Sequence, residues 1–567
     1  MRRSGTLFLL AFVCAGCEGE KRSAADPLDP IVARYLAAVQ ELEPEWATSL
    51  GLHEADPRST PVTAESFRAR RDTAAALLET LRQVDTARLD PDRRIDARIL
   101  EAELERTLKD FEREEWRRTP QMYIRFSGVH DLLVGEWAPA EARFRNAAQR
   151  LRRIPEAVGA GRAQLENPPR LWVEMAERNA RSVVRFLRDE LPGRAAELPA
   201  ALRDTVTAAA DDAARALEAY AVFLRDTLGP RANGEWAAGA EYYDWLLREA
   251  HFLDEDADAL IRLGARWMTE TEAALAAAAE SIAPGKTWRQ LTEEAKTRHP
   301  SAEPGAVRAA YEAEMRRALA LIRARDLFEV PAGERLRMID TPPTLRTTYP
   351  YGGYDSPAPF DSVRVGRFFV TPVEPGWTQA EVEAKLRGHN FGWITVVSLH
   401  EAYPGHHLQY VKAFEHPSDV RKIFSNSYFT EGWALYCEHL MGREGFYTTA
   451  DARLTQLRMR LWRAARVVID PSIHTGRMTY DDAVRLLVER VGLEEADARG
   501  EVNRYTTWPT QAPSYLVGMM QILEMRDAAR ARLGTGYTDK HFHEALLAGG
   551  SLPMALARRS LEERIQE

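Results

Sequence analysis

Residues 393–407 read Trp-Ile-Thr-Val-Val-Ser-Leu-His-Glu-Ala-Tyr-Pro-Gly-His-His, an apolar run that leads into a cluster of histidines. The apolar run predicts a helix whose end carries His400 and Glu401. Pro404 removes the amide that would bond the carbonyl of His400, so we expect the helix to bulge or break there. A chance group of polar residues is the alternative, but three of the 13 histidines fall within this one stretch, which favours a site.

The stretch is close to His-Glu-x-x-His, in which two imidazoles bind zinc and the glutamate polarises the bound water. The strict motif fails because Pro404 stands where the second histidine belongs. On an undistorted helix His407 returns within roughly 20° of His400, whereas His406 lies about 120° away. A bulge of two extra residues would instead bring His406 onto that face, so geometry leaves both histidines open as the second ligand.

A third metal ligand is predicted in residues 430–436, Thr-Glu-Gly-Trp-Ala-Leu-Tyr, where Glu431 follows His406 by 25 positions. Its carboxylate would complete a site of two histidines and one glutamate with a position left for water. The small residues beside the tryptophan would allow close approach, although Glu431 could merely cap its helix. Glu438 lies seven residues on, hence on the same face, and is expected to bond a ligating imidazole.

The rest of the chain reads mainly as helix. Apolar residues at spacings of three and four predict helices over residues 31–52 and 93–115, and residues 363–370 form the best strand. We predict a helical scaffold half, residues 30–340, and a catalytic half with the metal site, residues 341–567. The fold class is therefore mainly α with a small sheet.

Composition indicates a globular protein. The chain has 567 residues, 45% of them hydrophobic and 28% charged, which excludes a disordered chain or a disulfide mini-scaffold. The net charge of −9 offers no basic field, so no nucleic-acid partner is expected.

The N-terminus predicts export. Residues 1–16 read as a signal peptide, and the Cys-Ala-Gly-Cys that ends at Cys17 resembles the bacterial lipobox. We expect a lipidated tether over residues 17–29 and membrane contact through this lipid only. The same resemblance implies, from Glu18 after the cysteine, the periplasmic face of the outer membrane; an ordinary cleaved signal is the alternative. Cys437 then remains alone and reads as packing, so no internal disulfide is expected.

The motifs His-Glu-x-x-Pro-Gly-His-His, Glu-Gly-Trp-Ala-Leu-Tyr and the later Gln-Ala-x-Ser-Tyr at 511–515 resemble the bacterial family catalogued as domain of unknown function 885. That family is similar to the gluzincin peptidases. The resemblance implies a large helical peptidase fold with a small sheet beside a deep active-site channel, and one Zn²⁺ per chain. In the dipeptidyl peptidase III family the His-Glu helix holds one extra residue and ends in Gly-His, which favours His406 over His407.

Further roles are expected from the resemblance and from residue chemistry. His474 would stabilise an oxyanion, as a histidine does in related gluzincins, or would belong to a structural pair on a helix that breaks at Pro471. Tyr515 is the candidate phenolic donor, with Tyr505 as the weaker one. Arg504, beside Tyr505, would pair with a substrate carboxylate or form a structural ion pair.

The sequence thus predicts an envelope zinc metallopeptidase that cleaves short peptides, with Glu401 activating the zinc-bound water. The strand at 363–370 would pair with an extended peptide. A zinc amidohydrolase acting on non-peptide amides and a non-catalytic envelope binding lipoprotein are the alternatives. The oligomeric state is left open.

Overall fold

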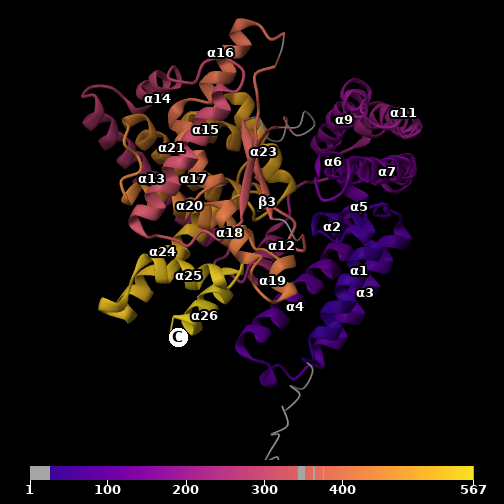
Figure 1. Ribbon diagram of the computed structural model, residues 1–567, viewed down its shortest axis with the longest axis horizontal. Coiled ribbons are helices and arrows are strands. Elements are labelled where there is room, and N and C mark those ends of the chain that lie inside the picture. Colours follow the sequence, from indigo (N-terminus) through magenta and orange to yellow (C-terminus); the bar gives the residue numbers. More distant parts are fainter. Residues whose placement is uncertain (1–25, 342–345, 347–350, 362–363, 375, 566–567) are drawn as a thin grey trace, which may run out of the picture.

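The computed structural model describes residues 26–341, 346, 351–361, 364–374 and 376–565 (Figure 1). Helices make up 71% of the structure and one three-stranded sheet is present, so the predicted mainly α fold with a small sheet is confirmed. The predicted signal peptide, residues 1–16, and Cys17 lie outside the described residues, as does most of the predicted tether. In the part of the chain that is described, no helix is long and apolar enough to cross a membrane.

The helices before the sheet are, in chain order, α1 (Asp29–Leu42), α2 (Pro44–Ser49), α3 (Ala64–Arg82), α4 (Pro91–Glu112), α5 (Glu115–Arg118), α6 (Ser127–Val134), α7 (Ala140–Leu151), α8 (Ile154–Gln164), α9 (Arg170–Arg185), α10 (Leu191–Arg194), α11 (Ala200–Val222), α12 (Ala240–Trp245), α13 (Ala257–Ile282), α14 (Trp288–Lys296) and α15 (Ala306–Arg325). Those after it are α16 (Gln379–Gly388), α17 (Phe391–Glu401), α18 (His406–Ala413), α19 (Asp419–Ile423), α20 (Ser427–Arg443), α21 (Ala450–His474), α22 (Tyr480–Leu486), α23 (Glu495–Thr507), α24 (Ser514–Leu533), α25 (Asp539–Ala548) and α26 (Met554–Arg564).

The predicted helices follow the chain's capping and proline signals. The helix expected over residues 93–115 is α4, which begins where the Asp90 carboxylate accepts a hydrogen bond from the Arg93 main-chain N–H at 2.9 Å. The helix expected over 31–52 is divided into α1 and α2, because Pro44 has no N–H with which to continue α1.

Two large hydrophobic cores organise the molecule. One lies within residues 62–232 and packs α6, α7, α9 and α11 together, at the right of Figure 1. The other joins α1, α3 and α4 to helices from α13 to α26, and α13 packs along α21. The core around the candidate site therefore draws on both sides of the expected boundary at residue 340.

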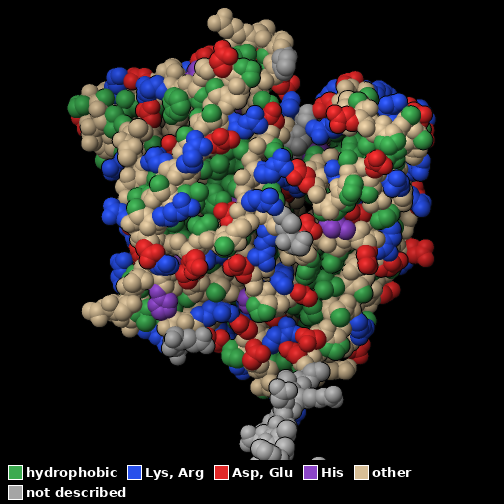
Figure 2. Space-filling view, viewed as in Figure 1, with side chains coloured by type: hydrophobic (Ala, Val, Ile, Leu, Met, Phe, Trp, Pro, Cys, Tyr) green, Lys and Arg blue, Asp and Glu red, His purple; other side chains and the backbone are tan. Residues whose placement is uncertain are grey.

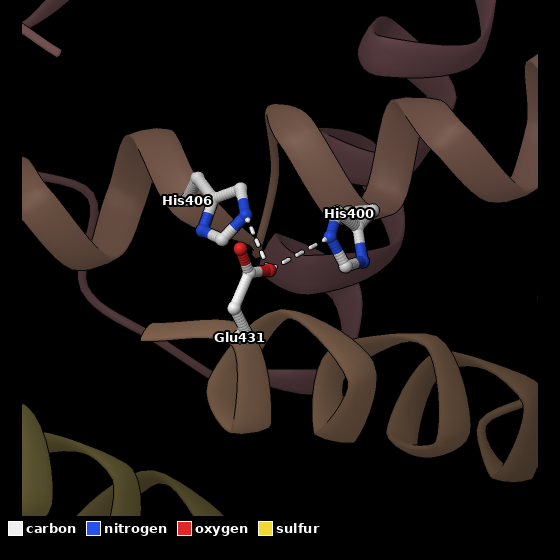
Figure 3. A group of neighbouring side chains, drawn as sticks. All are labelled: His400, His406 and Glu431. Atoms are coloured by element: carbon white, nitrogen blue, oxygen red, sulfur yellow. Dashed lines mark ion pairs between the residues drawn. The ribbon is translucent and has the colours of Figure 1, made fainter. Parts of the chain in front are cut away.

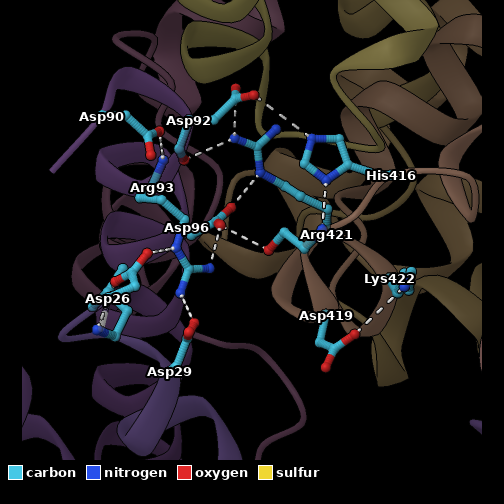
Figure 4. A network of polar contacts seen from close by, with 12 residues as sticks. Asp26, Asp29, Asp90, Asp92, Arg93, Asp96, His416, Asp419, Arg421 and Lys422 are labelled. Carbon is cyan, nitrogen blue, oxygen red and sulfur yellow. Dashed lines mark hydrogen bonds and ion pairs between the residues drawn. The ribbon is translucent and has the colours of Figure 1, made fainter. Parts of the chain in front are cut away.

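A buried ion-pair network ties the N-terminal helices to this core (Figure 4). Arg421, on α19, places its Nε 2.5 Å from Oδ1 of Asp96 on α4, and both side chains are fully buried. Ser418 donates to Oδ2 of Asp96 at 2.7 Å, and Arg93 lies 3.0 Å from the same oxygen. A buried pair of this kind costs several kcal/mol to break from one side, so it fixes α4 against the segment that follows α18.

The sheet has the order β1-β3-β2, with β1 (Arg335–Asp340) parallel and β2 (Gly352–Asp355) antiparallel to the central β3 (Val365–Val370). The strand expected over residues 363–370 is β3, which begins two positions later, at Val365; Arg364 precedes the strand, and residue 363 is not described. Its suggested pairing with a peptide substrate is wrong, because both sides of β3 are already hydrogen-bonded to neighbouring strands. The outer edges of the sheet belong to β1 and β2.

Candidate metal centre

The helix is interrupted rather than bulged: α17 ends at Glu401, and α18 begins at His406 after the non-helical residues 402–405. The Tyr403–Pro404 peptide bond is cis, and the Gly405 N–H donates to the carbonyl of Leu399 at 3.0 Å. A Cβ on Gly405 would lie 1.8 Å from the carbonyl oxygen of His400. Glycine is therefore required for the return that starts α18 at His406.

Two side chains of α20 hold this turn. Trp433 donates its indole N–H to the carbonyl of Pro404 at 2.9 Å, and the Cys437 thiol donates to the same oxygen at 3.4 Å. Both side chains are fully buried, and Cys437 is a free cysteine in the core, as its position within a helix indicated.

The interruption brings His400, His406 and Glu431 together (Figure 3). Oε2 of Glu431 lies 3.5 Å from Nε2 of His400 and 3.3 Å from Nε2 of His406. One potential ligand atom from each of the three residues lies within 4.8 Å of the others. The three predicted ligands thus converge, with the two histidines at the facing ends of α17 and α18 and the glutamate on α20.

His407 is directed elsewhere. Its Nε2 lies 2.5 Å from Oε2 of Glu334, and its Nδ1 lies 3.1 Å from the Tyr354 hydroxyl. A Cβ on Gly366 of β3 would meet the His407 ring at 2.5 Å, so a glycine is needed where this histidine packs beneath the sheet. Of the two histidines that sequence geometry left open, the structure brings His406 into the cluster.

The donor set fits a zinc ion. A tetrahedral zinc with bonds of 2.0–2.1 Å separates its ligand atoms by roughly 3.3–3.4 Å, close to the two spacings observed here. Oε2 of Glu431 is buried without a hydrogen-bond partner although two imidazole nitrogens face it. Such unsatisfied buried atoms are rare in proteins and are expected where a metal completes the site.

Glu438 supports the first ligand as expected. Its Oε1 lies 2.8 Å from Nδ1 of His400, and Arg463 lies 3.9 Å from the same oxygen. Burial lowers the pKa of His400, but the neighbouring carboxylates of Glu431 and Glu438 outweigh burial and raise it to about 9. Burial raises the pKa of Glu431, yet the neighbouring His406 and His400 hold it well below its usual range. A metal and a proton would therefore compete for these side chains.

Two further predicted residues border the cluster. Glu401 follows His400 directly and is half-buried; its charge acts on His400, and its carboxylate makes no hydrogen bond or ion pair with any described residue. The Tyr515 ring on α24 stacks on that of His400 with centroids 6.1 Å apart. The guanidinium carbon of Arg466 lies 4.5 Å from the centroid of the Tyr515 ring. No described residue bonds the Tyr515 hydroxyl. A carboxylate and a phenol thus stand beside the cluster with their polar atoms uncommitted.

Close helix packing places Tyr515 there. A Cβ on Gly432 of α20 would lie 2.5 Å from the backbone of Gly518 on α24, and one on Gly518 would lie 1.8 Å from the carbonyl of Tyr428. The close approach expected from Gly432 is therefore present, and its partner is Gly518, which no sequence motif singles out.

The structure does not bring His474 into the cluster. Its Nδ1 accepts a hydrogen bond from the Ala238 N–H at 3.1 Å, and its Nε2 lies 3.0 Å from the carbonyl of Tyr505. Burial lowers the pKa of His474 to about 4, so both ring nitrogens are committed to the backbone in a neutral ring. The expected helix break at Pro471 is wrong, because α21 continues through that proline to His474.

Tyr505 and Arg504 also belong to an internal network. The fully buried Tyr505 donates its hydroxyl to Glu501 at 2.7 Å and accepts from Nε of Arg466 at 3.1 Å. Arg504 donates to Glu501 at 3.0 Å and to the side-chain oxygen of Gln511 at 2.5 Å. The structural ion pair that was the alternative for Arg504 is thus present.

Gln511 is a site residue that sequence reasoning quoted only as part of a motif. Its side-chain N–H donates to Oε1 of Glu431 at 3.4 Å, which links the cluster of His400, His406 and Glu431 to Arg504. Tyr410 was missed altogether: its ring lies 6.4 Å from that of His406 and also lines a cavity of about 1040 Å³. The predicted channel to the cluster stays a prediction.

Comparisons with known proteins agree on the fold. The structure is similar to that of a "putative lipoprotein of unknown function" from Shewanella oneidensis, with a TM-score of 0.78 and 22% identity over 94% of this chain and 99% of that one. It is also similar to a "putative lipoprotein" from Colwellia psychrerythraea, with a TM-score of 0.81 and 19% identity over 96% of this chain and 100% of that one. At such identities the likeness shows a shared fold. The comparison with curated proteins found no match.

The sequence also matches a family model. It matches residues 44–561, which include the three candidate ligands together with Glu401, Glu438 and Tyr515. The chain therefore belongs to the bacterial family of proteins of unknown function catalogued as DUF885.

Proposed function

We propose that this protein is a zinc-dependent metallohydrolase that cleaves peptide bonds in short peptides. The observation that carries the proposal is the convergence of His400, His406 and Glu431 at spacings that suit tetrahedral zinc, beside the uncommitted carboxylate of Glu401. A structural zinc site needs ligands but no base, and such sites are usually closed by a fourth protein ligand. The presence of Glu401 therefore favours a catalytic centre.

Zinc held by these three side chains would supply a Lewis acid that acidifies water and polarises a carbonyl. Glu401 accepts the proton of the attacking water and later delivers it to the leaving amine. Tyr515 donates its free hydroxyl to the oxyanion of the tetrahedral intermediate. Glu438 keeps the proton of His400 on Nδ1, so that Nε2 faces the cluster with its lone pair.

The proposal places the enzyme in the bacterial cell envelope as an exported lipoprotein. The lipobox-like segment that ends at Cys17 supports this, as do the names of the Shewanella and Colwellia proteins. Because Glu18 follows that cysteine, we propose anchoring at the periplasmic face of the outer membrane, through lipid alone.

A mass-spectrometric peptide-library digest tests the function. The soluble form, residues 26–567, is supplied with zinc and compared with Glu401→Gln, which keeps all three ligands. We expect the wild type to cleave short peptides and the variant to lose at least about 10³-fold in rate, since it lacks the base. If the zinc-loaded wild type cleaves non-peptide amides but no peptide, the protein is an amidohydrolase and the proposed substrate class is wrong. If it cleaves neither, the reading that remains is a non-catalytic binding lipoprotein.

A further inference from the structure

A second, smaller cavity lies between the N-terminal helices and the sheet. It measures about 290 Å³ and is lined by residues of α6, α9 and β2, among them His130, Asp131, Tyr354 and Asp355. Asp131 and Asp355 also line the larger cavity of about 1040 Å³, so the two hollows adjoin at these carboxylates. On the face drawn in Figure 2 the surface is hollowed between the same two parts of the molecule.

Polar groups in the smaller cavity lack protein partners. His130 is only 5% exposed, and its Nε2 is buried with no hydrogen bond. The half-buried carboxylate of Asp131 makes no hydrogen bond or ion pair with any described residue. Leaving a buried polar group unpaired costs about 1–3 kcal/mol, and proteins keep such groups mainly where a ligand or water satisfies them.

The neighbouring charges are already compensated. Arg367 donates to the Asp355 carboxylate from Nε at 2.9 Å, and Arg125 is ion-paired with Glu45. Asp131 is therefore the carboxyl group of this cavity that forms no direct ion pair with a described residue, although Arg367 and Arg150 act on it from a distance. Burial, and then the charge of Asp355, raise the pKa of Asp131 to about 7.

His130 and Asp131 together select a hydrogen-bond donor that carries positive charge. Burial lowers the pKa of His130 to about 3, so its ring is neutral and offers a lone pair. A primary ammonium has three donors and can satisfy a carboxylate and an imidazole at once. An anion would be repelled by Asp131 and Asp355, and an apolar group would leave both acceptors unpaired.

The cavity is separated from the metal cluster by one aromatic ring. Tyr354 lines the cavity, its ring stacks on that of His406 with centroids 6.3 Å apart, and its hydroxyl contacts His407. An extended peptide advances about 3.3–3.6 Å per residue. A group bound in this cavity would therefore lie within a few residues of a bond at the cluster.

Resting on the proposed function, we propose that this cavity is a specificity subsite in which Asp131 and His130 bind a primary ammonium group of the substrate. Two sources share this chemistry: the amino terminus of a short peptide and the side chain of a lysine residue.

Matched peptides separate the sources. One set carries a free or an acetylated amino terminus, and the other carries lysine, Nε-acetyl-lysine or norleucine. They are tested on wild type, Asp131→Asn, His130→Gln and the control Glu136→Gln, which alters a carboxylate of the larger cavity that is already ion-paired with Arg337. We expect Asp131→Asn to lower kcat/KM about 10–100-fold for the cationic peptide alone, His130→Gln to lower it less, and Glu136→Gln to leave the preference unchanged.

A binding measurement keeps this inference apart from the proposed function. Calorimetric titration of metal-free protein with the same peptides is expected to show binding of the cationic member that is lost in Asp131→Asn. Such binding without any cleavage would support the subsite and contradict the peptidase proposal. The subsite is overturned if cationic and neutral peptides bind and react alike, or if Asp131→Asn weakens all of them equally.

Discussion

Replacing Glu438 by glutamine tests how the candidate metal centre is built. Glu438 is fully buried, and its Oε1 lies 2.8 Å from Nδ1 of His400. A carboxylate can only accept at this position, so the imidazole proton stays on Nδ1 and Nε2 is free to bind metal. A glutamine amide can instead donate to Nδ1, which favours the tautomer whose Nε2–H cannot act as a ligand.

The expected loss of zinc affinity is about 10–100-fold, the usual effect of removing the hydrogen-bond partner of a ligating histidine, or about 1.4–2.8 kcal/mol. Competition with a chromogenic chelator at neutral pH measures it, and circular dichroism confirms that the variant is folded. Glu334→Gln is the matched control, because it alters the same kind of pair at His407, which lies outside the cluster. Zinc affinity of Glu438→Gln within twofold of wild type, or an equal loss in Glu334→Gln, would refute the reasoning.

Four other variants probe packing, charge and catalysis. Gly518→Ala should lose about 1–3 kcal/mol of unfolding free energy from overpacking. Gly500→Ala, in a helix with nothing within 4 Å of the new Cβ, should gain up to about 1 kcal/mol. Equal denaturant midpoints for the two variants would contradict this. Burial lowers the pKa of His53, but its bonds to Asp361 and a second aspartate outweigh burial and raise it to about 9. His53→Gln should therefore cost about 1–2 kcal/mol of stability below pH 6.5 and progressively less as the pH rises through about 9, by denaturant titration at several pH values; a cost that is constant with pH would count against the ion pair. Tyr515→Phe should lower kcat about 10²–10³-fold while zinc content and KM change little, and loss of zinc instead would assign this tyrosine a structural role.

Much of the fold could be predicted from local pattern. Helical periodicity found α4, and the lone run of β-branched and aromatic residues found β3, because both signals lie within a single element. The place of β3 at the centre of the sheet was out of reach, since it depends on pairing with segments far along the chain. A suggestion that treated β3 as an edge was wrong for that reason.

In the site, too, local pattern identified some residues, and contacts distant in sequence decided the others. His400, Glu401 and Glu431 could be chosen by residue type and spacing, whereas the choice between His406 and His407 could not. That choice depends on Gly405 turning the chain against His400 and on Trp433, about thirty positions later, holding the turn. The hydrogen bonds of both His474 ring nitrogens to the backbone could not be predicted either, because the residues that supply these partners belong to no motif.

Zinc content tests the central claim most directly. Elemental analysis of residues 26–567 after zinc loading and extensive dialysis should give about one zinc per chain for wild type, Glu401→Gln and Glu334→Gln. His400→Ala and Glu431→Ala, each of which removes one of the three ligands, should retain almost none. A folded wild-type protein that binds no zinc, or ligand variants that retain as much zinc as wild type, would contradict the account.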